Sequence, residues 1–344
     1  MTVGPMSPSV LVTGAAGFIG AHVAAALCDA GFDVVGCDRA GGEGLLARLR
    51  HDRVTHFLVG RHVPFEVVDL SEPGEVEALF ARHRFDRVVH LAAQAGVRQS
   101  AEMPQAFVRS NLVAFGHLLE ACRHARVEHL VYASSSSVYG AREATPFRED
   151  DRADAPTSLY AATKRANELM AHSYAHLFEL PCTALRFFTV YGPWGRPDMA
   201  YFDFAQRIRR GEPITVYGRG ELRRDFTYVD DIVEGVRRVA ALPCAAPGGA
   251  APHLVLNIGN HEPVEVSVFV RLLEQALGRA AIVRYAPVHK GDVPITCADV
   301  TRLRALTGFA PRTPLADGLE RFARWLEAWD PLAAEAASPS SPPG

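Results

Sequence analysis

The stretch Val10-Leu-Val-Thr-Gly-Ala-Ala-Gly-Phe-Ile-Gly20 decides the fold, because it joins a short apolar run to a turn with glycine at every third position. The run predicts a buried strand, and the pattern from Phe18 to Gly31 is typical of a helix that ends at a glycine. Glycines in a strand-to-helix turn permit a tight bend and bring the backbone close to a bound pyrophosphate. The G-x-x-G-x-x-G spacing differs from the usual G-x-G-x-x-G, so the turn by itself leaves a purely structural loop open.

Short apolar strands alternate with helices through the first half of the chain. We expect further strands at 33–37, 65–69, 87–91, 129–133 and 182–186. We expect helices among them at 75–83, 104–126 and 159–178. This alternation is typical of right-handed βαβ units. It predicts an α/β fold with a Rossmann-type doubly wound parallel sheet.

Prolines become frequent after residue 187 and separate shorter elements, with helices expected near 201–210, 268–277 and 315–328. We therefore predict a dinucleotide-binding domain at 1–188 that also takes in about 225–262. A smaller C-terminal α/β substrate domain is predicted at 189–224 and 263–332. The Ser/Pro-rich end, 333–344, is expected to be a disordered tail.

Composition excludes several classes of protein. With 48% hydrophobic and 22% charged residues, the 344-residue chain is typical of a globular protein rather than a disordered one. Its net charge of −3 provides no basic field for nucleic acid or an anionic membrane. No apolar run reaches the ~18–20 residues of a membrane helix, and the N-terminus does not have the pattern of a signal peptide. The six cysteines, without a Cys-x-x-Cys pair, fit the reduced thiols of a cytoplasmic protein and predict neither disulfides nor a metal site.

An acidic residue follows the glycine-rich turn at the distance that a dinucleotide requires. Asp38 ends the second expected strand, and a carboxylate there accepts the ribose hydroxyls of adenosine and repels a 2′-phosphate. The Asp38 carboxylate therefore favours NAD over NADP. The neighbouring Arg39 weakens this preference. Other contacts are expected at the carboxyl ends of later strands, where open α/β sheets bind ligands. The residues expected near the cofactor are Gly14, Gly17, Phe18, Ile19, Gly20, Asp38, Arg39, Asp69, Leu70, Leu91, Ala92, Ala93 and Gln94.

Tyr160 and Lys164 are the candidate catalytic pair. They are four residues apart in a predicted helix and so share one face. An ammonium near a phenol lowers its pKa, and a phenol with a lowered pKa serves as a general base or acid near neutral pH. The alternative is a surface tyrosine with a solvated lysine. Lys164 and Lys290 are the only lysines among the 36 lysine and arginine residues. A lysine at position 164 therefore indicates a specific local role, which argues against this alternative.

The glycine-rich turn, the run Ser134-Ser-Ser-Ser-Val-Tyr-Gly140 and Tyr160-x-x-x-Lys164 together resemble the extended short-chain dehydrogenase/reductase family. The resemblance covers about residues 9–330. Within that family, several long blocks look like those of UDP-glucuronate 4-epimerases. The blocks are His90–Arg98, Ser134–Gly140, Tyr160–His172, Arg186–Met199, Arg224–Asp231 and Gly291–Pro294.

The resemblance implies an isomerase that interconverts UDP-glucuronate and UDP-galacturonate through a 4-keto intermediate, with tightly bound NAD. It implies that Tyr160 takes the 4-hydroxyl proton while C4 gives a hydride to NAD. Lys164 would hold the nicotinamide ribose. Ser135 would hydrogen-bond the 4-oxygen, with Ser134 and Ser136 as open alternatives. A homodimer through a four-helix seam of residues 104–126 and 159–178 is also implied.

The acid group of a hexuronate requires its own partners, for which arginine and hydroxyl groups are suited. The resemblance places Thr189 and Arg196 near that carboxylate, with Ser136 and Ser137 as helpers. It assigns Arg224 to the UDP phosphates and Asp292 to the ribose. The predicted substrate contacts are Arg98, Ser135, Ser136, Ser137, Thr189, Arg196, Val216, Tyr217, Arg224 and Asp292.

Related activities differ at one position. In the family that this chain resembles, decarboxylases and dehydratases carry an acidic residue at the position of Ser137. A hexuronate oxidised at C4 is a β-keto acid that readily loses carbon dioxide, so we expect neutral serines and Arg196 to hold the carboxylate and keep that loss slow. The alternatives are a UDP-glucose 4-epimerase, a UDP-glucuronate decarboxylase-type enzyme and a non-catalytic NAD-binding module.

Overall fold

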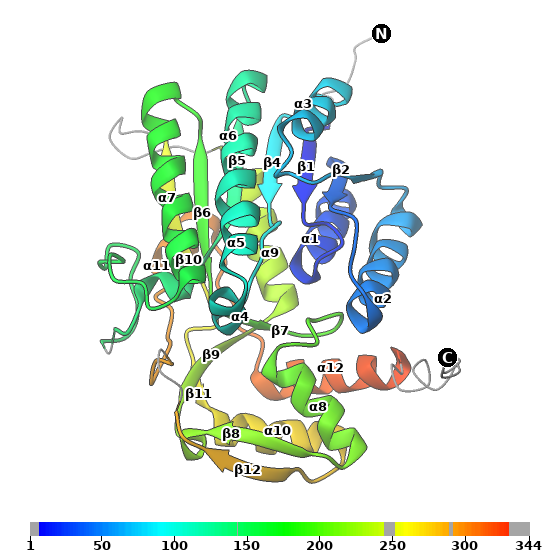
Figure 1. The fold of residues 1–344 in the computed structure, drawn as a ribbon, viewed down its shortest axis with the longest axis vertical. Helices are drawn as coiled ribbons and strands as arrows, with labels where there is room; N and C mark the ends of the chain where they lie inside the picture. The colour runs from blue at the N-terminus through cyan, green and yellow to red at the C-terminus, as the bar shows by residue number, and fades with distance from the viewer. Residues whose placement is uncertain (1–6, 143, 244–251, 289–291, 330–344) are drawn as a thin grey trace.

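The computed structural model describes residues 7–142, 144–243, 252–288 and 292–329, and the statements below concern these residues. Its largest unit is a seven-stranded sheet in the order β10-β6-β5-β4-β1-β2-β3, in which every pairing is parallel (Figure 1). The strands are β1 (Ser9–Thr13), β2 (Asp33–Asp38), β3 (Phe65–Val67), β4 (Arg87–His90), β5 (His129–Ser135), β6 (Cys182–Phe187) and β10 (His253–Ile258). The order reverses between β1 and β4, and ligands bind at such a switch point, beyond the carboxyl ends of the strands.

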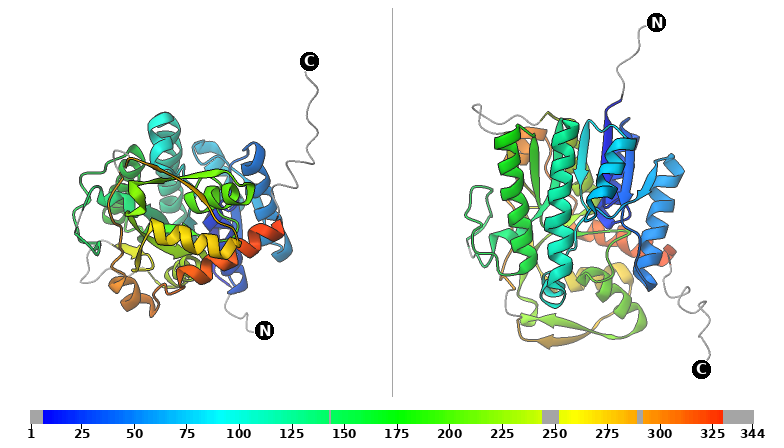
Figure 2. Two further views of the ribbon diagram at one scale, coloured as in Figure 1. Left: turned by 90° about the horizontal axis from the view of Figure 1, so that it is seen from below. Right: turned by 45° about the horizontal axis from the view of Figure 1, so that its top comes forward.

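Helices cover both faces of this sheet (Figures 1 and 2). One face carries α1 (Phe18–Asp29), α2 (Gly44–Arg53) and α9 (Val229–Ala241), and the other carries α3 (Pro73–Arg82), α6 (Ala114–Ala125) and α7 (Leu159–Phe178). Successive side chains of a strand point to opposite faces, so Val10 and Val12 of β1 pack in one core cluster and Leu11 packs in the other. Burial on both faces explains why these strands are continuous apolar runs.

The helix predicted at 104–126 has an irregular turn within it. Between α5 (Pro104–Val108) and α6 lies a π-helical turn, Arg109–Val113, that contains the buried Asn111. Single π turns are frequent at functional sites. Here the turn lies beside the loop that follows β4, to which the Asn111 side chain is hydrogen-bonded.

A smaller unit lies below the large sheet in Figure 1, where the strands end. It holds a three-stranded sheet, β11-β9-β7, and a two-stranded sheet, β12-β8. The strands are β7 (Thr189–Tyr191), β8 (Pro213–Tyr217), β9 (Arg223–Tyr228), β11 (Pro263–Glu265) and β12 (Ile282–Ala286). The helices are α8 (Ala200–Arg210), α10 (Val266–Leu277) and α12 (Leu315–Trp329). Two further short helices are α4 (Val97–Glu102) and α11 (Thr301–Thr307).

The predicted fold class is confirmed by the parallel sheet and its covering helices. Helix α2 is not predicted by the sequence pattern, because Leu49 is the one apolar side chain that it buries. The division into domains stays a prediction: β10 joins the large sheet, whereas β9 lies in the small one. The predicted tail at 333–344 lies outside the described residues. None of the helices in the described ranges combines the length and apolar character needed to cross a bilayer.

Candidate active site

The glycine-rich turn joins the end of β1 to α1 and lies against the chain that leaves β4. Gly14 has a φ of +71°, and a Cβ there would lie 2.7 Å from the Ala92 backbone nitrogen. A Cβ on Gly20 would lie 2.1 Å from the Gly14 carbonyl oxygen. The turn therefore has no room for side chains, and it brings the free N–H groups at the start of α1 to the switch point of the sheet. Such a helix start is a binding site for phosphate, so the turn fits a dinucleotide pyrophosphate.

Replacing Gly14 with alanine is expected to abolish NAD binding, since the new methyl group overlaps the backbone of residues 91 and 92 and the positive φ disfavours it. Gly31→Ala is the matched control, because Gly31 has a φ of +87° but a Cβ there meets nothing within 4 Å. The measurement is the NAD released per protein molecule on denaturation. Equal NAD contents in the two variants would contradict this role of the turn.

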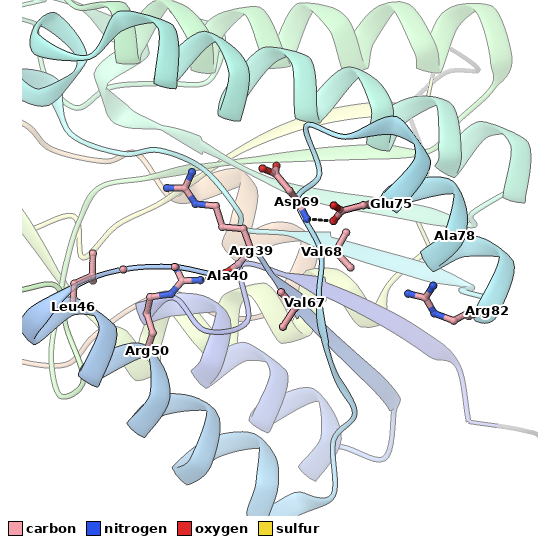
Figure 3. A pocket seen from close by; sticks show the side chains of 12 residues that line it. Arg39, Ala40, Leu46, Arg50, Val67, Val68, Asp69, Glu75, Ala78 and Arg82 are labelled. Atoms are coloured by element: carbon pink, nitrogen blue, oxygen red, sulfur yellow. Dashed lines mark hydrogen bonds between the residues drawn. The ribbon is translucent and has the colours of Figure 1, made fainter.

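The adenosine end of the expected cofactor site centres on Asp38. One carboxylate oxygen, Oδ2, accepts a hydrogen bond from the Ala16 backbone (3.2 Å). The other, Oδ1, accepts from the Arg39 backbone (2.9 Å) and lies 2.9 Å from Arg50 Nη2. A cavity of about 580 Å³ opens here, lined by Arg39, Arg50 and Asp69 among others (Figure 3). The sequence analysis did not predict Arg50, because it lies on the unpredicted helix α2.

Not every residue predicted near adenosine faces the cavity. Asp69 lines it, and its backbone N–H donates to Glu75 (Figure 3). The Leu70 side chain instead packs in the core between the sheet and α6, and its carbonyl oxygen lies 3.2 Å from His117 Nδ1. The two residues begin the turn that follows β3, in which the Glu72 backbone donates to the Asp69 carbonyl (2.9 Å).

The chain that follows β4 is held in place from two sides. The Ala92 backbone donates to Thr13 Oγ1 (3.2 Å) at the end of β1. Gln94 exchanges two hydrogen bonds with Asn111: its backbone N–H donates to Oδ1 (2.8 Å), and its carbonyl accepts from Nδ2 (2.9 Å). Residues Leu91 to Gln94 are therefore fixed and half-buried at the switch point, where the sequence analysis expects the pyrophosphate and nicotinamide ribose. Asn111 was not predicted, since nothing in the sequence marks the π turn.

Tyr160 and Ser135 meet where α7 begins and β5 ends. The Ser135 hydroxyl lies close enough to the Tyr160 phenol to influence its pKa. Burial raises the pKa of Tyr160, while the Ser135 hydroxyl and the positive charge of Arg196 act to lower it. The expectation was that Lys164 would lower this pKa. The structure differs, because the Lys164 ammonium donates to the Ala133 carbonyl (2.8 Å) and the cation acting on the phenol is Arg196.

The four serines before Val138 have different surroundings. Ser134 Oγ donates to Glu168 (2.6 Å), a buried carboxylate that is also paired with Arg186. Ser135 Oγ donates to Ser137 Oγ (3.1 Å). Ser136 and Ser137 are half-buried. Of the alternatives left open by the sequence, Ser134 is thus engaged in a buried ion-pair network. Ser135 is the serine that influences the pKa of the candidate catalytic phenol.

Lys164 is 3% exposed, and burial lowers its pKa to about 8. The unfolded chain keeps this proton up to its ordinary pKa of 10.5, so burial of the charge destabilises the folded state fully below pH 8. The penalty declines as the pH rises from 8 towards 10.5. Lys164→Met is therefore expected to abolish turnover yet raise the unfolding free energy of the NAD-free protein at pH 7 by about 1–2 kcal/mol. Denaturant unfolding at pH 7 and pH 10 checks this. A variant less stable than wild type at pH 7 would refute it.

Arg196 lies on the loop between β7 and α8 and reaches the end of β4. Its Nη2 donates to the Ala95 carbonyl (2.9 Å), and Nε and Nη2 bind the Asp198 carboxylate at 3.0 and 2.6 Å. Its charge and that of a Tyr160 phenolate act on each other. The structure thus places the Arg196 charge close enough to act on Tyr160. Thr189 is the half-buried first residue of β7, on the chain that leads to this loop.

The remaining residues predicted to contact the substrate have different surroundings. The Arg98 guanidinium lies 4.9 Å from the centre of the Tyr217 ring. Burial lowers the pKa of Arg224. The negative charge of the nearby Asp292 opposes this effect but does not outweigh it. The Val216 side chain is 3% exposed and packs in the core, because it alternates with Tyr217 along β8, and its contact with substrate stays a prediction.

The comparisons with known proteins agree with this geometry. Residues 10–259 match the NAD dependent epimerase/dehydratase family. A probable UDP-glucuronate 4-epimerase of Rhizobium meliloti (strain 1021) is 46% identical over 340 residues, covering 92% of this chain and 96% of the relative. UDP-glucuronate 4-epimerase 1 of Arabidopsis thaliana is 46% identical over 330 residues, covering 92% of this chain and 76% of that protein.

A solved structure shares the fold as well. The crystal structure of UDP-glucuronic acid 4-epimerase from Bacillus cereus, in complex with UDP-glucuronic acid and NAD, superposes with a TM-score of 0.85 at 32% identity. The match covers 93% of this chain and 99% of that one. These findings confirm the resemblance that the glycine-rich turn, the serine run and the Tyr-x-x-x-Lys pair indicate. The chain belongs to the NAD dependent epimerase/dehydratase family.

Proposed function

We propose that this protein is an NAD-dependent isomerase that epimerises UDP-glucuronate at C4 to give UDP-galacturonate. The observation that carries the proposal is the position of Arg196, whose positive charge acts on the candidate catalytic Tyr160. Tyr160 would deprotonate a hydroxyl group of the sugar. A cation beside Tyr160 can therefore pair with an acid group on the same sugar. The relatives and the solved structure that carry this activity in their names support the same substrate.

The residues of the chain handle the proton and position the sugar. Bound NAD supplies the hydride acceptor and donor at C4. Tyr160 takes the proton of the 4-hydroxyl and returns it after the keto sugar has turned its other face. Ser135, whose hydroxyl lies near the phenol, turns its proton from Ser137 to the 4-oxygen and orients it. Lys164 lies one helical turn from Tyr160 and holds the nicotinamide ribose.

Arg196 also protects the intermediate. The 4-keto hexuronate loses carbon dioxide when the C5–C6 bond breaks and its electron pair moves onto the C4 oxygen. The carboxylate loses its negative charge in that step, so an ion pair with Arg196 stabilises the ground state more than the transition state and slows the loss. Substrate binding requires that the sugar carboxylate replace Asp198 on the guanidinium. Ser136 and Ser137 are neutral and add no negative charge of their own to the site.

Product analysis tests the proposal. Purified protein is incubated with UDP-glucuronate without added cofactor, and the nucleotide sugars are separated. UDP-galacturonate is the expected main product. A UDP-pentose as the main product would identify a decarboxylase, and turnover of UDP-glucose in preference to UDP-glucuronate would identify the neutral-sugar epimerase.

We infer that the protein forms a homodimer through α6 and α7 and works in the cytoplasm. The two helices lie side by side (Figure 2) and leave apolar side chains exposed, Leu169 at 54% and Leu177 at 66%. These leucines are eight residues apart and share one face of α7. None of the five cysteines that the structure describes is in a disulfide, which suits a reducing compartment.

The double variant Leu169→Glu/Leu177→Glu is expected to be a monomer, because it places four carboxylates in the proposed seam of a dimer. Light scattering after size exclusion measures the mass. Tyr285→Glu serves as the control, since Tyr285 on β12 is 66% exposed but lies far from these helices. A double variant that keeps the dimeric mass would rule out this seam.

A further inference from the structure

Arg53 is a fully buried arginine that links the two halves of the site. It lies at the end of α2 and is 1% exposed. Its Nε donates to the Trp194 carbonyl (2.8 Å) and its Nη2 to the Gly195 carbonyl (2.7 Å). Its Nη1 donates to the Ala16 carbonyl (3.3 Å) in the glycine-rich turn. One guanidinium thus ties the two residues before Arg196 to the turn at which the dinucleotide binds.

The backbone that Arg53 holds has an unfavourable conformation. Trp194 has a φ of +62°, in the left-handed region that residues other than glycine rarely adopt. Gly195 has no room for a side chain, because a Cβ would lie 1.5 Å from the Tyr201 hydroxyl. Such a conformation persists where surrounding contacts enforce it. The two carbonyl groups that accept from Arg53 belong to these same two residues, and the Trp194 ring packs against His56 and Trp325.

Packing alone does not explain this arginine. The pKa of Arg53 is lowered to about 10, mainly by burial, and the positive charges of Arg50 and Arg196 contribute to this lowering. The group keeps its charge at neutral pH, and its hydrogen-bond partners among the described residues are three neutral carbonyl groups. A buried charge of this kind destabilises the folded state relative to an apolar side chain of similar volume. Sites that depart from optimal packing in this way are expected to serve function.

We propose that Arg53 is a positioning residue that fixes Arg196 on the carboxylate of the bound sugar. It does so by locking the loop that carries Arg196 onto the glycine-rich turn. The sugar carboxylate and the cofactor are then held at one fixed distance, because both depend on backbone groups bound to a single guanidinium. This inference rests on the proposed function, since it concerns how the acid group of the sugar is held.

Release of the loop has two measurable consequences. Arg196 would bind the carboxylate less well, so the preference for UDP-glucuronate over UDP-glucose would decrease. The keto intermediate would also lose carbon dioxide more often: the C5–C6 bond breaks, its electron pair moves to the C4 oxygen, and C5 takes a proton from water. A merely structural role would weaken both ligands alike and leave the product ratio unchanged.

The test compares Arg53→Met and Arg53→Lys with wild type and with Arg87→Met. Arg87 is the matched control, because it also donates to backbone carbonyls, those of Ala240 and Leu242, but at the opposite end of β4. Calorimetry gives the dissociation constants for UDP-glucose and UDP-glucuronate. The first divided by the second is the affinity ratio. Chromatography gives the fraction of decarboxylated UDP-pentose and UDP-4-keto-pentose.

We expect the affinity ratio to fall about tenfold in Arg53→Met, the size of one charge-assisted contact, and the decarboxylated fraction to rise several-fold. Arg53→Lys should show the same two changes, because one ammonium does not span three separated carbonyls, and it provides the test if Arg53→Met does not fold. Arg87→Met should match wild type. A wild-type affinity ratio and product ratio in a folded Arg53 variant would overturn the inference. Failure of wild type itself to epimerise UDP-glucuronate would instead overturn the proposed function.

Discussion

Replacing Tyr160 with phenylalanine is expected to lower kcat by about 10²–10⁴-fold, the range of a lost general acid–base group. The ring still packs at the start of α7, so NAD and UDP-glucuronate should remain bound. Stopped assays of product formation measure kcat, and calorimetry measures binding.

Tyr139→Phe provides the control for the loss of a buried hydroxyl. The Tyr139 phenol donates to Asn257 (2.6 Å) and lies in the same Ser-Ser-Val-Tyr segment, but it has no part in the proposed proton transfer. Its removal should reduce stability by about 1 kcal/mol while kcat stays within a few-fold of wild type. Retention of more than a tenth of wild-type kcat in Tyr160→Phe would exclude Tyr160 as the base.

Arg196→Met is expected to have the largest effect on substrate choice. Loss of one partner of a desolvated charge pair costs 2–5 kcal/mol, so affinity for UDP-glucuronate should fall by about 10²-fold or more. UDP-glucose, which has no carboxylate, should bind as it does to wild type. Equal losses for the two ligands would contradict the placement of Arg196 at the sugar acid.

The same variant should also change the pH dependence of turnover. The positive charge of Arg196 lowers the pKa of Tyr160, so its removal raises that pKa and moves the Tyr160 limb of the kcat profile to higher pH. Arg196→Lys keeps a charge and should leave the limb near its wild-type position. Arg207→Met, an exposed arginine of α8 paired with Asp203, controls for the loss of a positive charge elsewhere.

Local sequence patterns predict the large sheet and its main helices well. Residues 159–178 form α7 at the predicted bounds. The reason is local: the Ser158 hydroxyl accepts from the Ala161 backbone (3.1 Å) and so caps the helix start. The turn at 14–20 was predictable because its glycine requirement is steric.

The parts that were missed depend on contacts between distant segments. Helix α2 has few buried apolar residues, yet it carries both Arg50 and Arg53. Arg53 meets residues 141 and 142 positions further along the chain, a contact that no local pattern indicates. The side chains of Leu70 and Val216 pack in the core. For Val216 on β8, the side to which the side chain points depends on the register of the strand.

The most direct test of the account follows the hydrogen on C4. UDP-glucuronate that carries deuterium at C4 is incubated in ordinary water with purified protein and no added cofactor, and the product is examined by NMR and mass spectrometry. The account predicts UDP-galacturonate that keeps its deuterium at C4, because the hydrogen leaves and returns within one closed site. Exchange of that deuterium with water would contradict it.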